Sequence, residues 1–407
     1  MDAKKQGKAS SSENVNPMYR IKVYNKIAKE GLAIFNPALC TFGPDLEGPD
    51  AILLRSQNLH AEPLDAPLLA IGRAGAGVNN IPVDKCSEKG IVVFNTPGAN
   101  ANAVKELVLG ALFLSARQIV PAIKYTESLK GQGDQIPALV EKNKALFQGC
   151  ELRGKRLGVV GLGAIGMMVA NDALKLGLRV EGYDPFISVS RAWELSSEVK
   201  RAEDLNKMLS NVDFVSIHMP LTDKTKAFIS KETITHFKKG SVLLNFSRAE
   251  VVNEDDVIAA LDSGRLSLYV NDFPTEKLLA HPNAISIPHL GASTEEAETN
   301  CAVMVVEQLQ NYLQTGNIVN AVNFPDCVLE RSSNNRLCII NQNIPNMVGQ
   351  ITTILAEHKI NISEMVNKSR GDYACTLVDV NDTISDDIIQ NLKKIQGIVS
   401  VRNLQFV

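Results

Sequence analysis

Short apolar runs alternate with longer amphipathic stretches along most of the chain. The runs that have the length and composition of buried strands are residues 19–24, 52–54, 68–71, 157–160, 178–183, 212–217, 241–245, 268–270 and 285–287. Strands that alternate with helices form parallel sheets covered by helices on both faces. The pattern therefore predicts two successive α/β units.

A different order follows near the C-terminus. Pro325 and the polar residues 331–335 indicate a linker. After it the pattern predicts strand, helix, strand, strand, helix and strand at residues 337–340, 349–357, 362–366, 374–380, 384–394 and 399–407. This βαββαβ order predicts a small antiparallel sheet with two helices on one face.

A glycine-rich turn opens the second α/β unit. Strand 157–160 runs into Gly161, Gly163 and Gly166, a helical pattern follows, and the next strand ends at Asp184. Gly161 permits a tight turn, Gly163 lets backbone amides approach a pyrophosphate, and Gly166 lets the helix pack closely on the strand. Asp184 can accept hydrogen bonds from an adenosine ribose and repels a 2′-phosphate. The turn predicts a doubly wound, Rossmann-like domain that binds NAD.

Composition narrows the classes of partner. The 407 residues carry a formal net charge of −3 with no concentrated basic block, so no nucleic-acid partner is expected. No apolar run approaches the ~20 residues that span a bilayer, so no membrane partner is expected. The seven cysteines form no CxxC pair and indicate reduced thiols in the cytoplasm, and the six histidines lack metal-ligand spacing. Residues 1–17 are rich in Lys, Ser and Asn and contain almost nothing apolar, which predicts a disordered tail.

Polar residues and glycines follow the predicted strand ends. Arg55 and Ser56 come after strand 52–54 and can bind a phosphate or carboxylate; the alternative is a surface arginine beside a turn. Gly75 and Gly77 come after strand 68–71, where backbone amides can surround an anion. Three further residues of this kind are Arg248, Glu276 and His289. The carboxyl ends of parallel strands share one edge of a sheet, which is where ligands bind.

The strings that stand out are LLRSQ, GRAGAGVNNI, NTPGANANAVKE, VGLGAIG with YDP, HMPLT, NFSRAEVV, DFPTE and PHLGAST. In this order they resemble the D-isomer-specific 2-hydroxyacid dehydrogenase family, and within it the branch that acts on D-3-phosphoglycerate and carries a C-terminal ACT domain. The resemblance covers nearly all of residues 18–407. It implies a substrate domain at 18–101 and 298–330, an NAD domain at 102–297 and an ACT domain at 331–407.

The resemblance also implies catalytic roles. Arg248 would hold the C2 oxygen and carboxylate of the substrate, His289 would exchange the C2 hydroxyl proton, and Glu276 would pair with His289. The chemistry needs such a set, because hydride transfer from C2 requires removal of the hydroxyl proton and imidazole titrates near neutral pH. A carboxylate partner fixes the imidazole tautomer, and a guanidinium stabilises the developing alkoxide.

Binding residues are implied in the same way. Those for the substrate are Arg55 and Ser56 at the 3-phosphate, Ala74, Gly75, Gly77 and Asn102 at the carboxylate and C3 end, and Lys144, in a loop, as a further phosphate contact. Those for the cofactor are Ala164 and Ile165 at the pyrophosphate, Pro220 and Thr222 under the adenosine and nicotinamide, Asp272 at the carboxamide, and His218 as a wall of the pocket. Four steps separate Asp272 from Glu276 where the family usually has five, so an alternative alignment puts Asn271 in the place of the aspartate.

The implied activity is NAD-dependent oxidation of 3-phospho-D-glycerate to 3-phosphohydroxypyruvate, at the start of L-serine synthesis. The alternatives are a dehydrogenase of glyoxylate, hydroxypyruvate or D-lactate, and an NAD-sensing transcriptional corepressor. Asn341, Asn343 and Asn361 match positions at which ACT domains bind L-serine as a feedback inhibitor; alternatively this domain only dimerises. A homodimer or homotetramer is expected.

Overall fold

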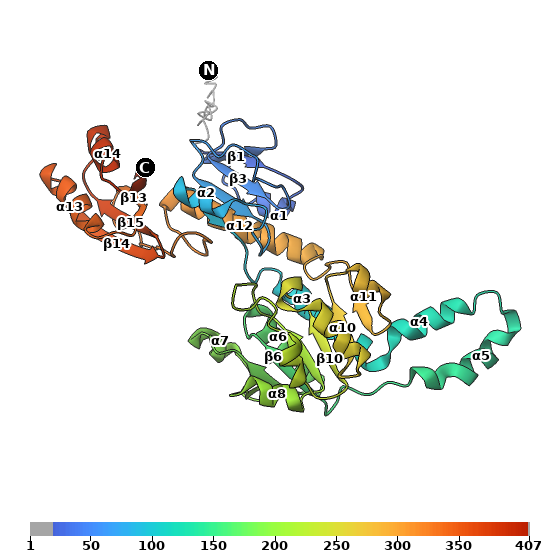
Figure 1. Cartoon of the computed structure of the whole chain (residues 1–407). Coiled ribbons are helices and arrows are strands. Elements are labelled where there is room, and N and C mark those ends of the chain that lie inside the picture. Colours follow the sequence, from blue (N-terminus) through green and yellow to red (C-terminus); the bar gives the residue numbers. More distant parts are fainter. Residues whose placement is uncertain (1–18, 406–407) are drawn as a thin grey trace, which may run out of the picture. The chain divides into compact units, whose positions relative to one another are not determined.

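The computed structural model describes residues 19–405, so the tail predicted at 1–17 and the end of the last predicted strand lie outside the described residues. The chain divides into two units. Unit 1 joins the residues up to Ala99 with those from Glu298 onward, and unit 2 is Asn100–Ala297. Unit 1 contains a parallel sheet and a C-terminal antiparallel sheet, and unit 2 contains a second parallel sheet (Figure 1).

The parallel sheet of unit 1 has the strand order β2-β1-β3-β4-β5. Its strands are β1 Tyr19–Val23, β2 Cys40–Gly43, β3 Ala51–Leu54, β4 Ala70–Arg73 and β5 Val92–Phe94. The helices are α1 Lys29–Leu32, α2 Val83–Glu88 and α12 Glu295–Thr315. Helix α12 packs on β4 so closely that a Cβ on Gly72 would lie 2.6 Å from Val305 Cγ2. The opposite face of the sheet packs on Leu59, Ile81 and Cys86, so both faces are buried.

The parallel sheet of unit 2 has the order β12-β11-β10-β9-β6-β7-β8. Its strands are β6 Arg156–Val160, β7 Arg179–Tyr183, β8 Lys200–Arg201, β9 Phe214–Ile217, β10 Ser241–Asn245, β11 Leu266–Asn271 and β12 Ala284–Ser286. The helices around it are α3 Ala101–Arg117, α6 Ala164–Lys175, α7 Val189–Glu194, α8 Leu205–Asn211, α9 Lys231–Thr235, α10 Glu254–Asp262 and α11 Glu276–Ala280. The order reverses between β6 and β9, and such a switch point is where dinucleotides bind in doubly wound sheets. The predicted α/β architecture is confirmed.

A helical arm extends from unit 2 (Figure 1). It consists of α4 Ile119–Ser128, a 3-10 turn Gly133–Gln135, α5 Ile136–Asn143 and a 3-10 turn Lys144–Phe147. None of these four helical segments contains a buried residue. The hydroxyl of Tyr125 donates to the carbonyl of Leu139 at 2.9 Å and its ring packs on Phe147, so the arm is held by its own contacts. The prediction that Lys144 lies in a loop is wrong, because this segment is helical.

The C-terminal region of unit 1 forms an antiparallel sheet with the order β14-β15-β13-β16. Its elements are β13 Asn335–Gln342, α13 Met347–Glu357, β14 Ile362–Arg370, β15 Tyr373–Val380, α14 Asp386–Lys393 and β16 Ile398–Gln405. Alternate residues of β13 face opposite ways: Leu337 and Ile339 pack on α13 and α14, whereas Cys338 and Ile340 join the core around α12. The predicted βαββαβ sheet is confirmed, and its second face is buried within unit 1.

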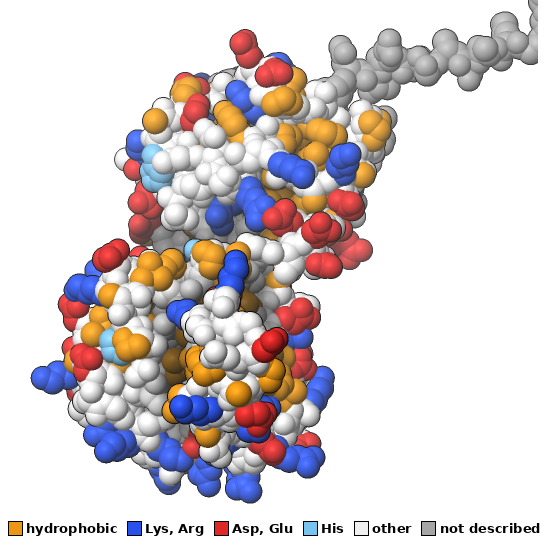
Figure 2. Space-filling view, turned by 90° about the vertical axis from the view of Figure 1, so that its right-hand side faces the viewer, with side chains coloured by type: hydrophobic (Ala, Val, Ile, Leu, Met, Phe, Trp, Pro, Cys, Tyr) orange, Lys and Arg blue, Asp and Glu red, His pale blue; other side chains and the backbone are white. Residues whose placement is uncertain are grey.

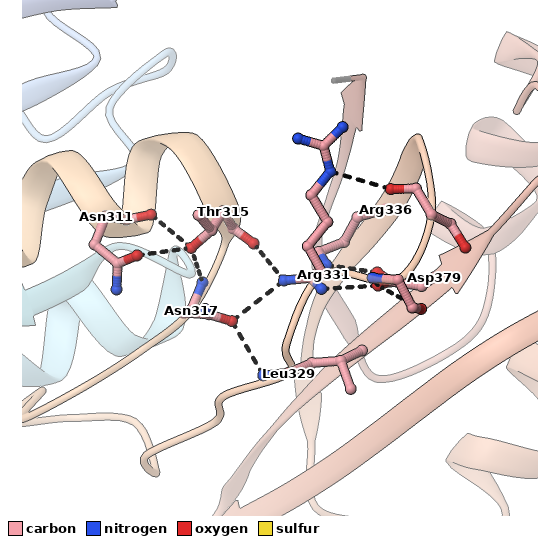
Figure 3. Close-up of polar contacts among 9 residues, drawn as sticks. Asn311, Thr315, Asn317, Leu329, Arg331, Arg336 and Asp379 are labelled. Atoms are coloured by element: carbon pink, nitrogen blue, oxygen red, sulfur yellow. Dashed lines mark hydrogen bonds and ion pairs between the residues drawn. The ribbon is translucent and has the colours of Figure 1, made fainter. Parts of the chain in front are cut away.

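A buried ion pair joins this sheet to α12 (Figure 3). Arg336 Nε lies 2.5 Å from Asp379 Oδ1 and Arg336 Nη2 lies 2.8 Å from Asp379 Oδ2, and both side chains are fully buried. Arg336 Nη1 also donates to the carbonyl of Thr315 at 3.0 Å, at the last residue of α12. Ser332 donates to the same carboxylate through its amide and its hydroxyl. One guanidinium therefore connects β13, β15 and the end of α12.

Within residues 19–405, no single helix is long and apolar enough to cross a membrane. Helices α3 and α4 reach that length and apolar composition only together, and the chain bends by 64° between them.

We predict that Asp379→Ala lowers the free energy of unfolding by about 3–5 kcal/mol, because it leaves the Arg336 charge buried without a partner. Burial raises the pKa of Asp379, but the hydrogen bonds and charge of Arg336 outweigh it and leave the pKa below its ordinary value. The carboxylate therefore stabilises the fold fully above about pH 4 and loses this effect as the pH falls through the folded-state pKa. Urea unfolding of the wild type and the variant measures this difference. The control is Asp255→Ala, which removes the exposed partner of Lys277 and should not measurably change the free energy of unfolding. Equal effects of the two substitutions would contradict the prediction.

Candidate functional site

The glycine turn of unit 2 is shaped by backbone contacts. Gly161 follows β6 with φ +91°, and a Cβ there would lie 2.7 Å from the carbonyl oxygen of His218. A Cβ on Gly166 would lie 1.9 Å from the carbonyl oxygen of Gly161. Gly163 is different, because a Cβ there would meet nothing within 4 Å. Gly161 and Gly166 are therefore needed for packing, whereas Gly163 leaves open space.

Helix α6 begins beside this space. Gly163 is its N-cap residue, and Ala164 and Ile165 form its first turn. The first amides of a helix have no intrahelical acceptor, and the helix dipole places partial positive charge there. A pyrophosphate suits such a position. The turn thus fits the dinucleotide that the sequence predicts.

Asp184 follows β7 and contacts the same turn. Its Oδ2 accepts a hydrogen bond from the amide of Leu162 and its Oδ1 accepts one from the amide of Phe186, both at 2.8 Å. An ionised carboxylate has about four acceptor positions. Acceptor capacity therefore remains for ribose hydroxyls, and this predicted role stays a prediction.

His218 lies behind the turn at the end of β9. Burial lowers its pKa to about 3, so the imidazole is neutral. Its Nε2 lies 2.8 Å from the hydroxyl of Ser216, and its Nδ1 has no partner in the described part of the chain. A ring that is neutral near pH 7 suits a wall rather than a proton carrier. Pro220 and Thr222 continue the same loop, which Thr225 braces by donating to the carbonyl of Pro220.

The three predicted catalytic residues lie at one edge of the sheet. Arg248, Glu276 and His289 follow β10, β11 and β12, which are neighbours in the strand order, and all three are exposed. Arg248 Nη1 donates to the carbonyl of Ser247 at 2.7 Å. Glu276 is the first residue of α11, and Thr275 caps that helix by accepting from the amide of Leu278. A guanidinium, a carboxylate and an imidazole thus follow the C-terminal ends of three adjacent strands.

The predicted pairing of Glu276 with His289 is not formed in this structure. Within residues 19–405 their side chains share no hydrogen bond or ion pair; Glu276 is exposed at the start of α11, and His289 is exposed in the loop after β12. The His289 ring instead packs against Phe273, edge to face, with centroids 5.3 Å apart. Asp272 is buried, and its carboxylate accepts from the amides of Leu290 and Gly291. Its predicted contact with a carboxamide stays a prediction.

The anion-binding candidates of unit 1 follow β3 and β4. Arg55 pairs with Glu298 at 2.7 Å, and the amides of Ser56 and Gln57 both donate to Asn25 Oδ1. Ala74, Gly75 and Gly77 form the next loop. Their neighbour Arg73 donates to the carbonyls of Arg55 and Gly77. Arg73 is not among the residues predicted above, although an arginine at a strand end inside GRAG is a signal for such a position.

Two predicted substrate residues lie elsewhere. Asn102 is in the first turn of α3 in unit 2, where its amide donates to Glu106 Oε1 at 2.9 Å. Lys144 lies in the arm and pairs with Glu141 at 2.6 Å. Both positions are exposed helix surfaces with local partners. The structure therefore adds nothing to their predicted contacts with the substrate.

The three asparagines predicted for regulation lie in the C-terminal sheet region. Asn341 is buried at the end of β13, and its Oδ1 has no partner within the described residues. Asn343 donates to the carbonyl of Gly371 at 3.1 Å, and the backbone amide of Asn361 donates to Asp382. Asn343 and Asn361 are exposed. No group of three or more His, Cys, Asp or Glu side chains suited to a metal is found among residues 19–405.

Comparison with known proteins gives a consistent result. The family model described as D-isomer specific 2-hydroxyacid dehydrogenase, NAD binding domain, matches residues 109–291. A D-3-phosphoglycerate dehydrogenase of Methanocaldococcus jannaschii is 35% identical over 306 residues, which are 74% of this chain and 55% of the relative. One of Haemophilus influenzae is 31% identical over 366 residues, which are 86% of this chain and 85% of the relative. The chain thus spans about half of the first relative and most of the second.

Solved structures agree on the fold. A 3-phosphoglycerate dehydrogenase of Entamoeba histolytica with bound NAD+ matches with a TM-score of 0.57 and 25% identity, over 75% of this chain and 98% of that one. A glyoxylate reductase of Paecilomyes thermophila matches with a TM-score of 0.62 and 23% identity, over 75% of this chain and 98% of that one. Both likenesses cover about three quarters of the chain.

We predict that Gly163→Ala and Gly166→Ala weaken NADH binding for different reasons. The first variant has open space for its Cβ and an ordinary φ of −67°, so its melting temperature should not change while NADH affinity falls about tenfold or more. The second forces the turn apart and should also lower stability by about 1–3 kcal/mol. Fluorescence titration and thermal melting measure the two effects. Wild-type NADH affinity in Gly163→Ala would rule out a phosphate beside this turn.

Proposed function

We infer that this chain, which belongs to the D-isomer-specific 2-hydroxyacid dehydrogenase family, is a cytoplasmic enzyme that oxidises 3-phospho-D-glycerate to 3-phosphohydroxypyruvate with NAD. The observation that carries this proposal is the set of Arg248, Glu276 and His289 on three adjacent strand ends of the sheet that bears the nucleotide turn. Relatives named D-3-phosphoglycerate dehydrogenase support it, and the match to one of them covers 85% of that relative. The seven cysteines, all unpaired, suit a reducing compartment.

Each residue at this edge has a separate role in the proposed oxidation of the C2 alcohol. His289 accepts the proton of the C2 hydroxyl, since imidazole changes protonation near neutral pH. Arg248 places positive charge where alkoxide character develops and binds the carboxylate. Glu276, which does not contact His289 in this structure, pairs with the protonated imidazole once the proton has moved and favours that form. NAD, when bound, supplies the acceptor of the C2 hydride.

The choice of a phosphorylated substrate rests on unit 1. Arg55 follows β3 and Arg73 is the last residue of the neighbouring β4, and Arg73 Nε donates to the carbonyl of Arg55 at 3.0 Å, so two arginines lie at one sheet edge. Guanidinium groups bind phosphate oxygens in a fixed, two-point geometry. We assign this pair to the 3-phosphate of the substrate. The pairing of Arg55 with Glu298 gives way when the more strongly charged phosphate binds.

We predict a strong preference for 3-phosphohydroxypyruvate over hydroxypyruvate, glyoxylate, pyruvate and 2-oxoglutarate in NADH depletion. Arg55→Gln should lower kcat/KM for the phosphorylated acid about 10- to 100-fold, since a charged hydrogen bond contributes about 1.5–3 kcal/mol. Rates with the unphosphorylated acids should not change.

The matched control is Arg179→Gln, which removes an exposed arginine from the first residue of β7 in unit 2. This variant should behave as wild type. A wild-type enzyme that is indifferent to the phosphate would favour a dehydrogenase of an unphosphorylated 2-hydroxy acid. Absence of turnover with every one of these acids would favour the corepressor.

We further propose that the chain forms a homodimer or homotetramer through unit 2. The arm carries three exposed apolar side chains, Ile123, Ile136 and Leu146, and its helical segments bury nothing. Figure 2 looks toward the arm and shows hydrophobic side chains on and around it. Short helices without buried faces are marginal in water, so a second copy is the expected cover. Sedimentation should give an oligomer for the wild type and a smaller species for Ile123→Glu with Leu146→Glu; unchanged mass would contradict this.

The C-terminal sheet region is, in our proposal, an ACT domain that binds L-serine. Its βαββαβ order and Asn341, whose buried Oδ1 has no partner in the described part of the chain, support this. Amide groups both donate and accept, as the carboxylate, ammonium and hydroxyl of serine require. Inhibition arises if serine binds one conformation of the enzyme more tightly than another.

We predict that L-serine inhibits the wild-type enzyme and that Asn343→Ala raises the serine concentration for half-inhibition while the uninhibited rate stays the same. Asn391→Ala, at a half-buried position of α14 where the side chain donates to Asp387, is the control and should be inhibited like the wild type. Steady-state rates over a range of serine concentrations measure this. Absence of inhibition in the wild type would contradict the prediction and indicate that the sheet region only dimerises.

A further inference from the structure

His289 has an unusual backbone conformation. Its φ is +54°, in the left-handed region, and its amide donates to the carbonyl of Ile287 at 2.9 Å. A residue with a Cβ holds this conformation at an energetic cost and keeps it only where the surroundings impose it. The ring of His289 is exposed, so packing alone does not impose it. Something else must restrain this loop.

The restraint comes from the buried carboxylate of Asp272. Its Oδ1 accepts from the amide of Leu290 at 2.7 Å, and its Oδ2 accepts from the amide of Gly291 at 2.8 Å. The residue is only 2% exposed. A buried carboxylate bound by two amides is a strong, directional contact, because both hydrogen bonds involve a charge. It binds the two peptide units that directly follow His289.

The neighbours of Asp272 hold the same loop from its other side. The carbonyl of Asn271 accepts from the amide of Ile287 at 2.8 Å, and Asn271 Nδ2 donates to the hydroxyl of Ser286 at 3.1 Å. Phe273 places its ring against the imidazole. Three consecutive residues at the end of β11 thus contact the backbone before His289, the backbone after it, and its ring.

We propose that Asp272 is a positioning residue that fixes His289 for proton transfer by binding the amides of Leu290 and Gly291. This rests on the function proposed above for His289. Asp272 acts through the backbone and touches neither the imidazole nor the substrate. A carboxylate is required because it presents two acceptor oxygens to two donors. The amide of asparagine has one acceptor oxygen, and its NH2 group would face the second donor.

The test compares the wild type with Asp272→Asn and Asp272→Ala. We expect kcat to fall about 10- to 100-fold, the loss that a displacement of about 1 Å produces, with KM for 3-phosphohydroxypyruvate and the Kd of NADH nearly unchanged. The dependence of kcat on pH should also change, since the proton acceptor no longer has one fixed environment. A purely structural role would lower stability without moving the pH profile.

Asp213→Asn is the matched control. Asp213 also has two partners, the amide of Arg156 at 2.9 Å and Lys238 at 2.7 Å, but it precedes β9 at the opposite edge of the same sheet. This variant should lose stability and keep the kcat and pH profile of the wild type. Weaker NADH binding as the main effect of the Asp272 substitutions would overturn the proposal and make Asp272 a cofactor contact.

Hydrogen exchange supplies a readout that needs no activity. In the wild type, a peptide covering residues 287–293 should exchange more slowly than expected for an exposed loop, and faster in Asp272→Asn. Fast exchange in the wild type would overturn the proposal even if both variants fail to fold. A wild type with slow exchange and no turnover would instead refute the proposed function, so the two failures are distinguishable.

Discussion

All strands of a parallel sheet end at the same edge, and this constraint brings together the candidate groups of each unit. In unit 2 the loops after five of the strands, β6, β7, β9, β10 and β12, carry Gly161, Asp184, His218, Arg248 and His289, which are far apart in the sequence. The helices that follow these loops point their amide ends toward the same edge. The sheet topology therefore brings functional residues together at this edge as long as a suitable residue follows each strand.

The features that could be predicted from the sequence are those that depend on buried residues, on a hydrophobic period, or on glycines at positions without room for a side chain. The roles predicted for Gly161 and Gly166 match the close contacts that a Cβ would make at those positions. Strand β2 was missed because it is an edge strand with one buried residue, Cys40, and so lacks an apolar run. The arm was not predicted, although α4 and α5 are at least as amphipathic as α3, because an apolar stripe indicates a helix but not which surface covers it.

Side-chain partners were the least predictable part of the site. A sequence shows that Asp184 and Asp272 follow strands, but not that backbone amides occupy their carboxylates. Loops at the edge of a sheet bury little apolar surface, so hydrogen bonds to charged groups must hold them in place. The same carboxylates can then present an ordered site without rearranging when a ligand arrives, which reduces the entropic cost of binding.

The C-terminal sheet is connected to β4 by an unbroken series of contacts within unit 1. Arg336 binds Asp379 in the sheet and the last carbonyl of α12, and α12 packs directly on Gly72. Gly72 precedes Arg73, which contacts Arg55. Because packed cores deform little, a displacement of the sheet would be transmitted to the strand that carries Arg73 rather than absorbed at a hinge. Contact alone is not coupling, however, since a ligand shifts an equilibrium only by its differential affinity for two states. Regulation through this sheet therefore requires that the whole of unit 1, and not the sheet alone, has two arrangements.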